Sequence, residues 1–534
     1  MAPGFEQCNG EDDDCDGVPD EGALSPCGGC NPDCTGGVWG SIADPFDATG
    51  DLTLTPVGEL TLPFTPRESE TVWVPNTGDG TVSKIDAIRS VETARYATGG
   101  APERIAVDHN GDAWVLATSF EASSTLTKLA GDRSSCVDRD GDGLATSGGP
   151  DDVLALGTDE CVLFTRDVGE PGEVPRALAV DGTNTPDGFL GGNVWIGMER
   201  GARVVKFDGQ TGEPLAVVAT PEVAPHASVF DPWGILWLLD RDGILARVDP
   251  GARPASVDVI EAPLSCFALE SLASDRAGVL TLTGASCERV MVYDPARERW
   301  DDVKTDGVLT PRGVAALDDA SWVVHMSGEL SRVSRDPLVI EATYSLANAS
   351  RTPIESTAIG ADSSGQLWVV SARGGPRGTG VVTRFDPDRE KVAAQIPVGL
   401  RPRGQGDLTG FQQLGEFAPE GVASYVFSGC GPLERAPDPD RVGPPSEWRR
   451  VYVAATLGDG ASVTVEARHA DKRADLADEP FVVLGELPED ESPFDVAFDP
   501  GGVVEVRLTL RVAGRIGAPR IARVGLEWRC PGPI

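Results

Sequence analysis

A short apolar strand that recurs about every forty residues, usually with a tryptophan, constrains the fold most. It reads VWV at 72–74, AWV at 113–115, VWI at 194–196, LWL at 236–238, LTL at 280–282, SWVV at 321–324 and LWVV at 367–370. A polar turn such as DHNGD or DSSGQ precedes it, and a second strand with an acidic end, such as VSKID or VTRFD, follows it. Alternating strands between frequent turns indicate antiparallel β structure, and one such unit matches a four-stranded blade. The sequence therefore predicts an all-β chain built around a seven-bladed β-propeller.

The ends of the repeat predict how the ring closes. The last unit, VVTRFDPDREKVAAQIPVG at 381–399, has no tryptophan strand after it, and the spare strand lies near the start, at 71–74. We expect the strand at 71–74 to complete the last blade by pairing with the chain after residue 381. A closed ring removes exposed sheet edges.

One spacing in the repeat, between the second and third tryptophan strands, is about twice the period. The surplus includes CVDRDGDGLATSGGPDDVLALGTDEC at 136–161, so we predict an insertion at 131–163 that projects from the second blade. Asp138, Asp140 and Asp142 stand at positions 1, 3 and 5 of a calcium loop, and Gly143 stands at position 6. Position 12 is a glycine, so the closing ligand must be Asp151, Asp152, Asp159 or Glu160. The alternative is a solvated acidic loop held by a disulfide.

A similar acidic stretch, CNGEDDDCDGVPDEG, lies at 8–22. Seven like charges this close repel one another, so the stretch is either a disordered acidic tail or is held together by a cation. The alternate spacing predicts a second calcium site, although Ala23 stands where an EF-hand would place its closing glutamate. The candidate ligands are Asp12, Asp14, Asp16, Asp20 and Glu21.

Two resemblances follow from these patterns. The stretch at 8–22, with the CGGC after it, resembles a Cys- and Asp-rich metal-binding repeat of secreted and surface proteins from myxobacteria and related bacteria, over about residues 6–34. That likeness implies calcium and an extracytoplasmic setting. The pattern WVPNTGDGTVSKID…PERIAVDHNGDAWV resembles the seven-bladed propellers of the streptogramin (virginiamycin B) lyase family and related surface propeller repeats, over roughly residues 70–415.

After residue 415 the repeat stops, and a proline-rich link leads to alternating strands such as ASVTVEARHA and GVVEVRLTLRVAG. These strands predict a β-sandwich of jelly-roll type. The expected domains are therefore a Cys/Asp-rich calcium-binding module at 1–36, the propeller at 37–415 and the sandwich at 416–534. Trp448 and Trp528 could form a sugar platform, but we favour a buried position in the core.

The chain has 11 cysteines, and disulfides persist in oxidising compartments. Position in the sequence suggests four pairs: Cys8 with Cys15, Cys136 with Cys161, Cys266 with Cys287, and Cys430 with Cys530. Cys27, Cys30 and Cys34 remain, and a zinc site there would lack a fourth ligand nearby. We expect one of the three to bond to another chain or to a segment outside this sequence, which would make the N-terminal module a connector.

The formal net charge of −39 argues against nucleic acid and anionic lipid as partners. No apolar run reaches the roughly 18 residues that a membrane span needs. Met1 runs straight into the acidic motif without a signal peptide, from which we expect a mature or trimmed chain of an exported protein with an added methionine.

Loops that lead into the inner strands of a propeller converge on a funnel, which is the default ligand site. Seven residues of these loops are expected near one rim: Arg104, Arg176, His226, Glu270, Arg312, Glu355 and Arg403. Four arginines together would suit an anionic or carboxylated ligand. The alternative, which we favour at this point, is a lattice of arginine and glutamate that ties the blades together.

The lyase family uses a histidine on one blade, a Glu-x-His on the next, a further glutamate and magnesium. His226, Glu270 and Glu288 match three of these positions, but Leu272 replaces the second histidine and cannot transfer a proton. No other histidine takes its place, and no G-x-S-x-G, HExxH or phosphate-loop motif is present.

We therefore expect an exported, calcium-stabilised binding or structural protein of the cell surface or an extracellular assembly, with no catalytic activity. Its expected location is extracellular, at the cell surface or periplasmic. Its partners would be other protein subunits or surface glycans. The alternative function is that of a propeller lyase or hydrolase that acts at the funnel.

Overall fold

The computed structural model describes residues 38–39, 48–50, 52–55, 58–66, 70–181, 192–250, 255–263, 266–305, 310–317, 319–347, 354–410, 415–428, 446–458, 460–488, 490, 492–512 and 518–529. The chain divides into two compact units. One contains the span Thr65–Glu416, and the other contains the described residues up to Phe64 together with those from Phe417 onward. The propeller unit therefore begins at Thr65 and not at residue 37, as we expected, because the first short strands belong with the C-terminal unit. The expected module at 1–36 lies outside the described residues.

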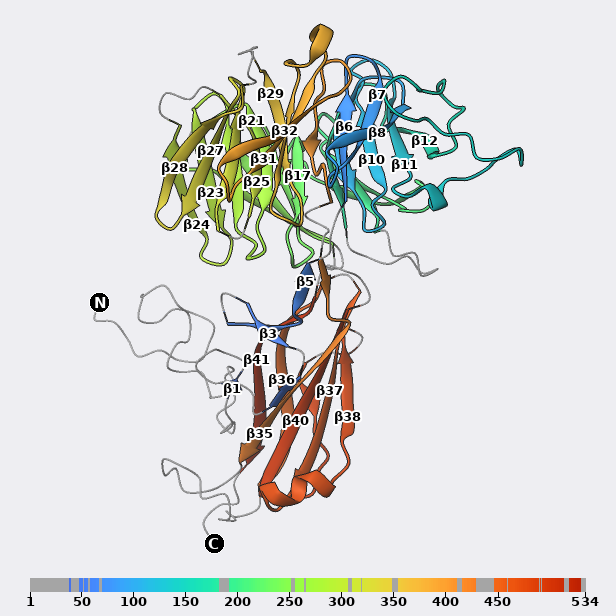
Figure 1. Cartoon of the computed structure of the whole chain (residues 1–534). Coiled ribbons are helices and arrows are strands. Elements are labelled where there is room, and N and C mark those ends of the chain that lie inside the picture. Colours follow the sequence, from blue (N-terminus) through green and yellow to red (C-terminus); the bar gives the residue numbers. More distant parts are fainter. Residues whose placement is uncertain are drawn as a thin grey trace. The chain divides into compact units, whose positions relative to one another are not determined.

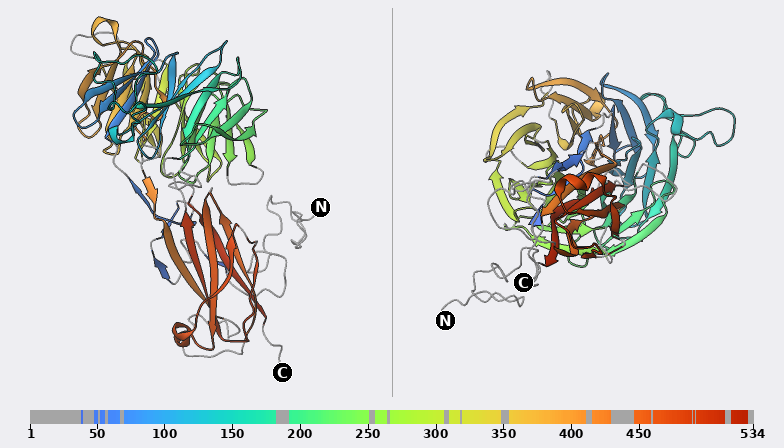
Figure 2. Two further views of the ribbon diagram at one scale, coloured as in Figure 1. Left: turned by 90° about the vertical axis from the view of Figure 1, so that its right-hand side faces the viewer. Right: turned by 90° about the horizontal axis from the view of Figure 1, so that it is seen from below.

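The span Thr65–Glu416 is a seven-bladed β-propeller, as the repeat predicted. Figures 1 and 2 show its sheets arranged in a ring, with the colour running around the ring from blue to orange. The strands of each blade are antiparallel and in sequence order, except that the short β33 (Gln405–Gly406) joins the sheet of blade two in parallel. In blades two to seven, the first strands of neighbouring blades contact one another, so they are the innermost strands.

The first four blades contain the following strands. Blade one has β6 (Thr71–Asn76), β7 (Thr81–Asp86) and β8 (Val91–Ala97); blade two has β9 (Pro102–Val107), β10 (Ala113–Ala117), β11 (Ser124–Leu129) and β12 (Val162–Val168). Blade three has β13 (Pro175–Val180), β14 (Val194–Met198), β15 (Arg203–Phe207) and β16 (Pro214–Ala219); blade four has β17 (Ala227–Phe230), β18 (Leu236–Leu239), β19 (Ile244–Asp249) and β20 (Ser256–Glu261).

The last three blades are complete four-stranded sheets. Blade five has β21 (Leu269–Ser274), β22 (Leu280–Gly284), β23 (Arg289–Asp294) and β24 (Arg299–Lys304); blade six has β25 (Pro311–Ala316), β26 (Ser321–His325), β27 (Glu329–Arg335) and β28 (Leu338–Ser345). Blade seven has β29 (Ser356–Ala361), β30 (Leu367–Ser371), β31 (Val381–Asp386) and β32 (Lys391–Pro397). A short 3-10 helix, η2 (Pro376–Gly378), lies between β30 and β31.

The recurring tryptophans are buried, and in blades two, three, four and seven the indole binds an aspartate at the end of the first strand. In blade four, the indole of Trp237 donates to Asp231 Oδ2 at 2.9 Å, while Oδ1 of the same aspartate accepts the backbone N–H groups of Trp233 and Ile235. The same tryptophan–aspartate bond joins Trp114 to Asp108, Trp195 to Asp181 and Trp368 to Asp362. One aspartate thus satisfies the turn and the buried indole together, which explains the recurrence of the motif.

The ring is closed by the segment 402–408, which lies beside β6. Asn76 and Pro402 form an antiparallel bridge, Arg403 N donates to Pro75 O at 3.0 Å, and Trp73 N donates to Leu408 O at 2.9 Å. Within that segment, β33 (Gln405–Gly406) also pairs in parallel with β9. The strand at 71–74 therefore pairs with a part of the chain that follows residue 381. It does not join 381–399, whose strands β31 and β32 belong to the complete blade of Trp368.

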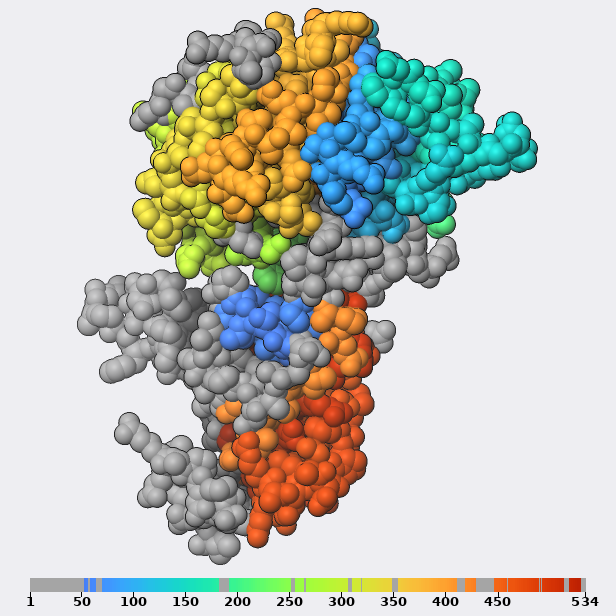
Figure 3. Space-filling model, viewed as in Figure 1, coloured from blue at the N-terminus to red at the C-terminus, as the bar shows by residue number. Residues whose placement is uncertain are grey.

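The insertion in blade two follows β11 and contains η1 (Arg133–Ser135). It forms the teal lobe of the propeller in Figure 3. The predicted disulfide Cys136–Cys161 is confirmed, and Arg95 N on β8 donates to Gly148 O at 3.0 Å. The insertion therefore packs against the outer strand of the neighbouring blade, in addition to projecting from its own.

The predicted disulfide Cys266–Cys287 is also confirmed, in blade five. Cys8, Cys15, Cys27, Cys30, Cys34, Cys430 and Cys530 lie outside the described residues.

The other unit contains two sheets. One has the order β3 (Thr53–Leu54), β4 (Leu60–Thr61), β41 (Arg520–Arg529), β36 (Glu447–Thr456) and β39 (Phe494–Asp495), with β1 (Val38–Trp39) on β41. The other has the order β2 (Ala48–Gly50), β35 (Glu420–Ser428), β40 (Val503–Val512), β37 (Ala461–Ala470) and β38 (Val482–Leu487). The 3-10 helix η4 (Arg473–Asp478) follows β37, and β5 (Phe64–Pro66) and β34 (Gly415–Phe417) lie where the sequence passes between the units.

Burial in this unit follows the alternation that the sequence showed. Every second residue along most of β37 is buried, so that strand presents one apolar face to a core. Trp448 and Trp528 are only 4% and 8% exposed, and their ring centroids are 5.9 Å apart. They are core residues, as we favoured, and are not available as a sugar platform. The jelly-roll arrangement stays a prediction.

Candidate functional site

A cavity of about 580 Å³ opens at the end of the propeller where the innermost strands begin. Its lining is dominated by charged side chains from blades two to seven and from the closing segment. We call it the funnel. The lining residues are Thr77, Gly78, Glu103, Arg176, His226, Arg241, Glu270, Arg312, Met326, Glu355, Ser356, Thr357, Ala372, Arg373, Arg401, Arg403 and Gln405.

A β-bulge at the second residue of the innermost strand aims a side chain into the funnel in five blades. In blade six, Pro311 pairs with His325 and Gly313 with Val324, so Arg312 is left out of the ladder. The equivalent unpaired residues are Glu103, Arg176, Glu270 and Thr357. All five line the cavity. A bulge redirects a side chain that would otherwise alternate with its neighbours, and bulges concentrate beside functional sites.

Backbone strain concentrates at the same place. The residue before the innermost strand has a positive φ in blades three, five and six: 54° at Val174, 58° at Ala268 and 56° at Thr310. Arg401, immediately before the closing segment, has a φ of 45°. Such conformations cost non-glycine residues about 1–3 kcal/mol each and persist where the surroundings impose them.

Glutamates join the arginines of the funnel across blades. Glu103 binds Arg176 and also Arg403, the latter at 3.2 Å. Glu270 accepts from Arg312 at 3.0 Å and from Gln405 at 3.1 Å. Arg241 reaches Glu270 at 3.5 Å, and Arg373 pairs with Glu355 at 3.3 Å. The lattice that the sequence suggested is therefore present.

His226 lies beside this lattice, between the carboxylate of Glu199 and the guanidinium of Arg104. Its Nδ1 is 3.0 Å from Glu199 Oε1, and its Nε2 is 3.1 Å from a terminal nitrogen of Arg104. An arginine can only donate, so Nε2 accepts and Nδ1 carries the proton that Glu199 accepts. Burial, with the nearby charge of Arg104, lowers the pKa of His226 to about 4. The imidazole is therefore neutral at physiological pH.

The pKa values of the groups around His226 are shifted as well. Burial, with the positive charge of Arg176, lowers the pKa of Arg104 to about 10. Burial alone would raise the pKa of Glu199, but its contacts with His226 and the two arginines lower it overall. Arg104 therefore remains charged at neutral pH, and Glu199 stays ionised beside it.

Positive charge is in excess at the funnel. Among the described residues that line it, six are arginines and three are glutamates. Arg104 and Glu199 lie behind His226 and add one charge of each sign. Arg401 forms no ion pair with any described residue, and the buried Nε of Arg104 has no hydrogen-bond partner among them. The excess is notable in a chain with a formal net charge of −39.

The structure brings together most of the seven loop residues that the sequence predicted for the funnel. Arg176, His226, Glu270, Arg312, Glu355 and Arg403 line the funnel, and Arg104 is buried behind His226. Sequence reasoning missed Glu103, Glu199, Arg241, Arg373, Arg401 and Gln405. Three of these residues, Glu199, Arg241 and Arg373, come just after second strands. The polar sequences GMERG, LLDRDG and VVSARGG at these places could have indicated them.

The geometry does not assemble the lyase constellation. Glu288 is exposed in the turn between β22 and β23 and does not line the funnel, and Leu272 is buried in the core. His325 is buried and contacts Ser331. Both ring nitrogens of His226 are already engaged, so it is positioned as a structural hydrogen-bonding group.

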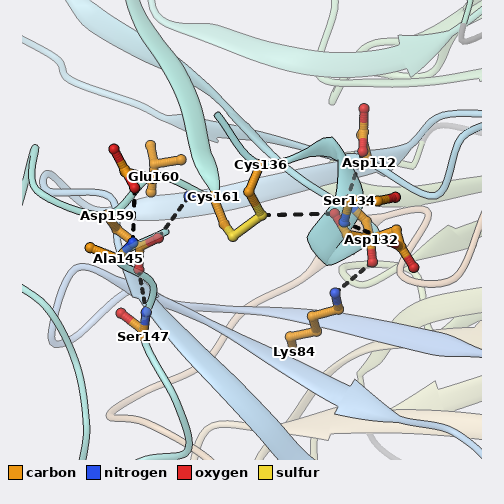
Figure 4. Close-up of a disulfide and its surroundings, with 12 residues drawn as sticks. Lys84, Asp112, Asp132, Ser134, Cys136, Ala145, Ser147, Asp159, Glu160 and Cys161 are labelled. Carbon is orange, nitrogen blue, oxygen red and sulfur yellow. Dashed lines mark hydrogen bonds between the residues drawn. A yellow bond between two sulfur atoms is a disulfide. The ribbon is translucent and has the colours of Figure 1, made fainter. Parts of the chain in front are cut away.

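The predicted calcium loop of the insertion brings three carboxylates together. Ligand oxygens of Asp138, Asp140 and Glu160 lie within 4.8 Å of one another. Glu160 Oε1 accepts the N–H of Arg139 at 2.6 Å, and its Oε2 accepts that of Ala145 at 2.8 Å. Figure 4 shows Asp159 and Glu160 beside Cys161, with their carboxylates toward the backbone of Ala145 and Ser147. The Cys136–Cys161 disulfide therefore anchors the chain next to Glu160, whose carboxylate reaches the loop.

Two of the candidate closing ligands need correction. Asp151 and Asp152 are exposed and, like Asp142 and Asp159, are not part of the gathered group of Asp138, Asp140 and Glu160. Asp142 lies beside Asp140, and the hydrogen bond and repulsion between the two carboxyls raise the pKa of Asp142. Crowded carboxylates of this kind fit a hard cation such as Ca²⁺. The candidate ligands Asp12, Asp14, Asp16, Asp20 and Glu21 lie outside the described residues.

No family model and no curated protein matches the chain. Solved structures similar to it include virginiamycin B lyase from Staphylococcus aureus, at 15% identity over 57% of this chain and 88% of that one, with a TM-score of 0.40. A functionally unknown protein from Desulfotomaculum acetoxidans is 9% identical over 63% and 98%, with a TM-score of 0.43. The RRP9 WD40 repeats are 10% identical over 66% and 92%, with a TM-score of 0.43.

The resemblance to streptogramin lyase propellers is thus found again among solved structures. Because all three TM-scores are below 0.5, we base the fold and the site on this chain's own strands and side chains. In the described part of the chain, no helix has the length and apolar character needed to cross a membrane.

Proposed function

We propose that this protein is a binding protein whose propeller funnel holds an anionic ligand, and that it acts without catalysis. The observation that carries the proposal is the set of six arginines against three glutamates, several of them aimed into one cavity by β-bulges. Guanidinium groups bind carboxylates and phosphates through charge-assisted, often bidentate, hydrogen bonds.

The lattice supports binding because it holds the arginines in place before a ligand arrives. Glu103 and Glu270 each contact two arginines, so those guanidiniums need little ordering on binding. Arg401 is exposed and has no described ion-pair partner, which makes it the side chain that a ligand can engage without breaking a native pair. The lattice and the ligand site are therefore two roles of one cluster.

The test is isothermal titration of the full chain with citrate, which carries three carboxylates. Binding should weaken as salt increases, and a neutral polyol of similar size should not bind. Arg401→Gln should weaken citrate binding about tenfold, since one hydrogen bond to a charged group contributes about 1.5–3 kcal/mol. Arg89→Gln is the matched control, because Arg89 is exposed in the β7–β8 turn at the other end of the blade. Absence of citrate binding, or equal loss in both variants, would contradict the proposal.

We also propose an exported setting with calcium bound in the insertion. The two disulfides support an oxidising compartment, and the gathered carboxylates of Asp138, Asp140 and Glu160 support the ion. Partners at the cell surface or in an extracellular assembly, whether protein subunits or glycans, belong to this proposal. A connecting disulfide through Cys27, Cys30 or Cys34 also belongs to it, and non-reducing gels of native material would reveal it.

A further inference from the structure

Exposed apolar side chains lie at the end of the propeller where the funnel opens. Phe120, Leu156, Phe267, Met326 and Leu400 are 52%, 60%, 62%, 38% and 41% exposed. Phe120 and Met326 follow second strands, Phe267 precedes β21, and Leu400 precedes the closing segment, so all four lie at the strand ends where the funnel opens. Leu156 of the insertion lies against Gly99, just after β8 ends at the same level. We call these five residues the rim.

Members of the rim are in contact with funnel arginines. The guanidinium of Arg176 lies 5.3 Å from the ring centroid of Phe120, and that of Arg200 lies 5.6 Å from it. Arg312 donates to the sulfur of Met326 at 3.4 Å, and Leu400 immediately precedes Arg401. A ligand that reached the rim would therefore meet apolar surface and positive charge side by side.

The positions of the rim residues exclude a small molecule as the sole occupant of this surface. Phe120 belongs to blade two and Met326 to blade six, so they lie on different sides of a ring of seven blades. A small anion seated in the funnel would leave the rim uncovered, whereas a chain segment can fill the cavity and extend over its mouth. The chain enters the propeller at Thr71 and leaves it after Leu408, both at the strand ends away from the funnel, so the mouth is clear of these connections.

We propose that the funnel and rim together bind an acidic peptide segment of a partner protein, with its carboxylates on the funnel arginines and its apolar side chains on the rim. This inference rests on the proposed function and names the ligand class. Charge complementarity favours an acidic segment, because the funnel is positive. Three of the five rim residues are aliphatic or thioether side chains, which suit leucine-like partners better than the flat faces of sugars.

The experiment measures binding of fluorescein-labelled short peptides to the full chain by anisotropy. One set contains glutamate and leucine in several orders, a second set has serine in place of leucine at equal charge, and oligogalacturonate is the carboxylated glycan probe. We expect at least one glutamate–leucine peptide to bind about tenfold or more tightly than every glutamate–serine peptide. The double variant Leu156→Ser with Phe267→Ser should remove that advantage and leave citrate binding unchanged, because no contact joins either side chain to a funnel arginine among the described residues.

Ile88→Ser is the control, because Ile88 is 69% exposed in the β7–β8 turn at the opposite strand ends. The inference is overturned if both peptide sets bind equally or not at all, if the rim variant binds like the control, or if oligogalacturonate binds more tightly than every peptide. In each of these cases citrate can still bind, and the proposed function stands. If citrate also fails to bind, the proposed function fails with it.

Discussion

His226 should make the stability of the propeller depend on pH in a way that one substitution removes. Its pKa is about 4 in the folded protein, below the ordinary value of 6.5, because it is buried beside Arg104. The unfolded chain therefore takes up a proton on this residue between pH 6.5 and 4, while the folded chain does not. The unfolded state is stabilised in that window, so the free energy of unfolding falls as the pH is lowered through it.

The two pKa values set the size of the effect. Between pH 7.5 and 4.5, the unfolded histidine gains most of a proton while the folded one remains mainly neutral. The two states differ in protonation over slightly less than two pH units. At 1.36 kcal/mol per unit, this lowers the free energy of unfolding by about 2.5 kcal/mol. Other groups, including carboxylates, titrate over the same range, so the comparison has to be made against a variant.

His226→Gln is the suitable variant, because its amide can donate to Glu199 and accept from Arg104 without titrating. Urea unfolding of both proteins at pH 7.5 and 4.5 gives four free energies of unfolding. The wild type should lose about 2.5 kcal/mol more than the variant between the two pH values. Equal losses would show that His226 is not held neutral, and would refute the hydrogen-bonding scheme at the base of the funnel.

Three further predictions concern the ring, the insertion and a disulfide. Gly406→Ala should destabilise the propeller by about 1–3 kcal/mol in urea unfolding, because a Cβ there would lie 2.1 Å from a backbone oxygen of β9. Gly365→Ala is the control, because Gly365 also has a positive φ but has open space around it. Equal effects of the two substitutions would contradict the closure of the ring by 402–408. Glu160→Gln, or chelation of calcium, should make residues 136–161 more sensitive to protease and lower the melting temperature; identical digestion patterns with and without chelator would remove the calcium site. Replacing both Cys266 and Cys287 by serine should cost about 3 kcal/mol in the same unfolding assay, and an unchanged midpoint would count against the bond.

The blades could be predicted from the sequence because their repeat is coupled to a physical requirement. A buried indole needs a hydrogen-bond partner, and the aspartate that precedes it provides one, so aspartate, turn and tryptophan recur together. Blade five shows the limit, since Leu280 and Leu282 occupy the strand without a tryptophan and only the spacing identifies it. We did not predict that the short strands between residues 48 and 61 belong to the C-terminal unit. A strand of two or three residues is too short to show the alternation of apolar and polar residues that identifies a strand.

The funnel could be predicted only where its residues share one place in the repeat. Arg176, Glu270 and Arg312 come from the same bulged position of the innermost strands of blades three, five and six, and the sequence places that position near the axis. Arg401 comes from a loop whose direction no repeat rule gives, whereas Arg241 shares a place just after a second strand with Glu199 and Arg373. Glu160 was one of four open choices in the calcium loop, because only the fold and the Cys136–Cys161 bond decide which carboxylate reaches it.

The central claim is that the funnel is a site for anions, and a crystal structure of the chain soaked with citrate tests it most directly. The account predicts density for citrate in the funnel, with a carboxylate within about 3 Å of the Arg401 guanidinium and with the Glu270–Arg312 pair intact. Density for citrate only outside the funnel, or a funnel that contains only water at saturating citrate, would contradict it.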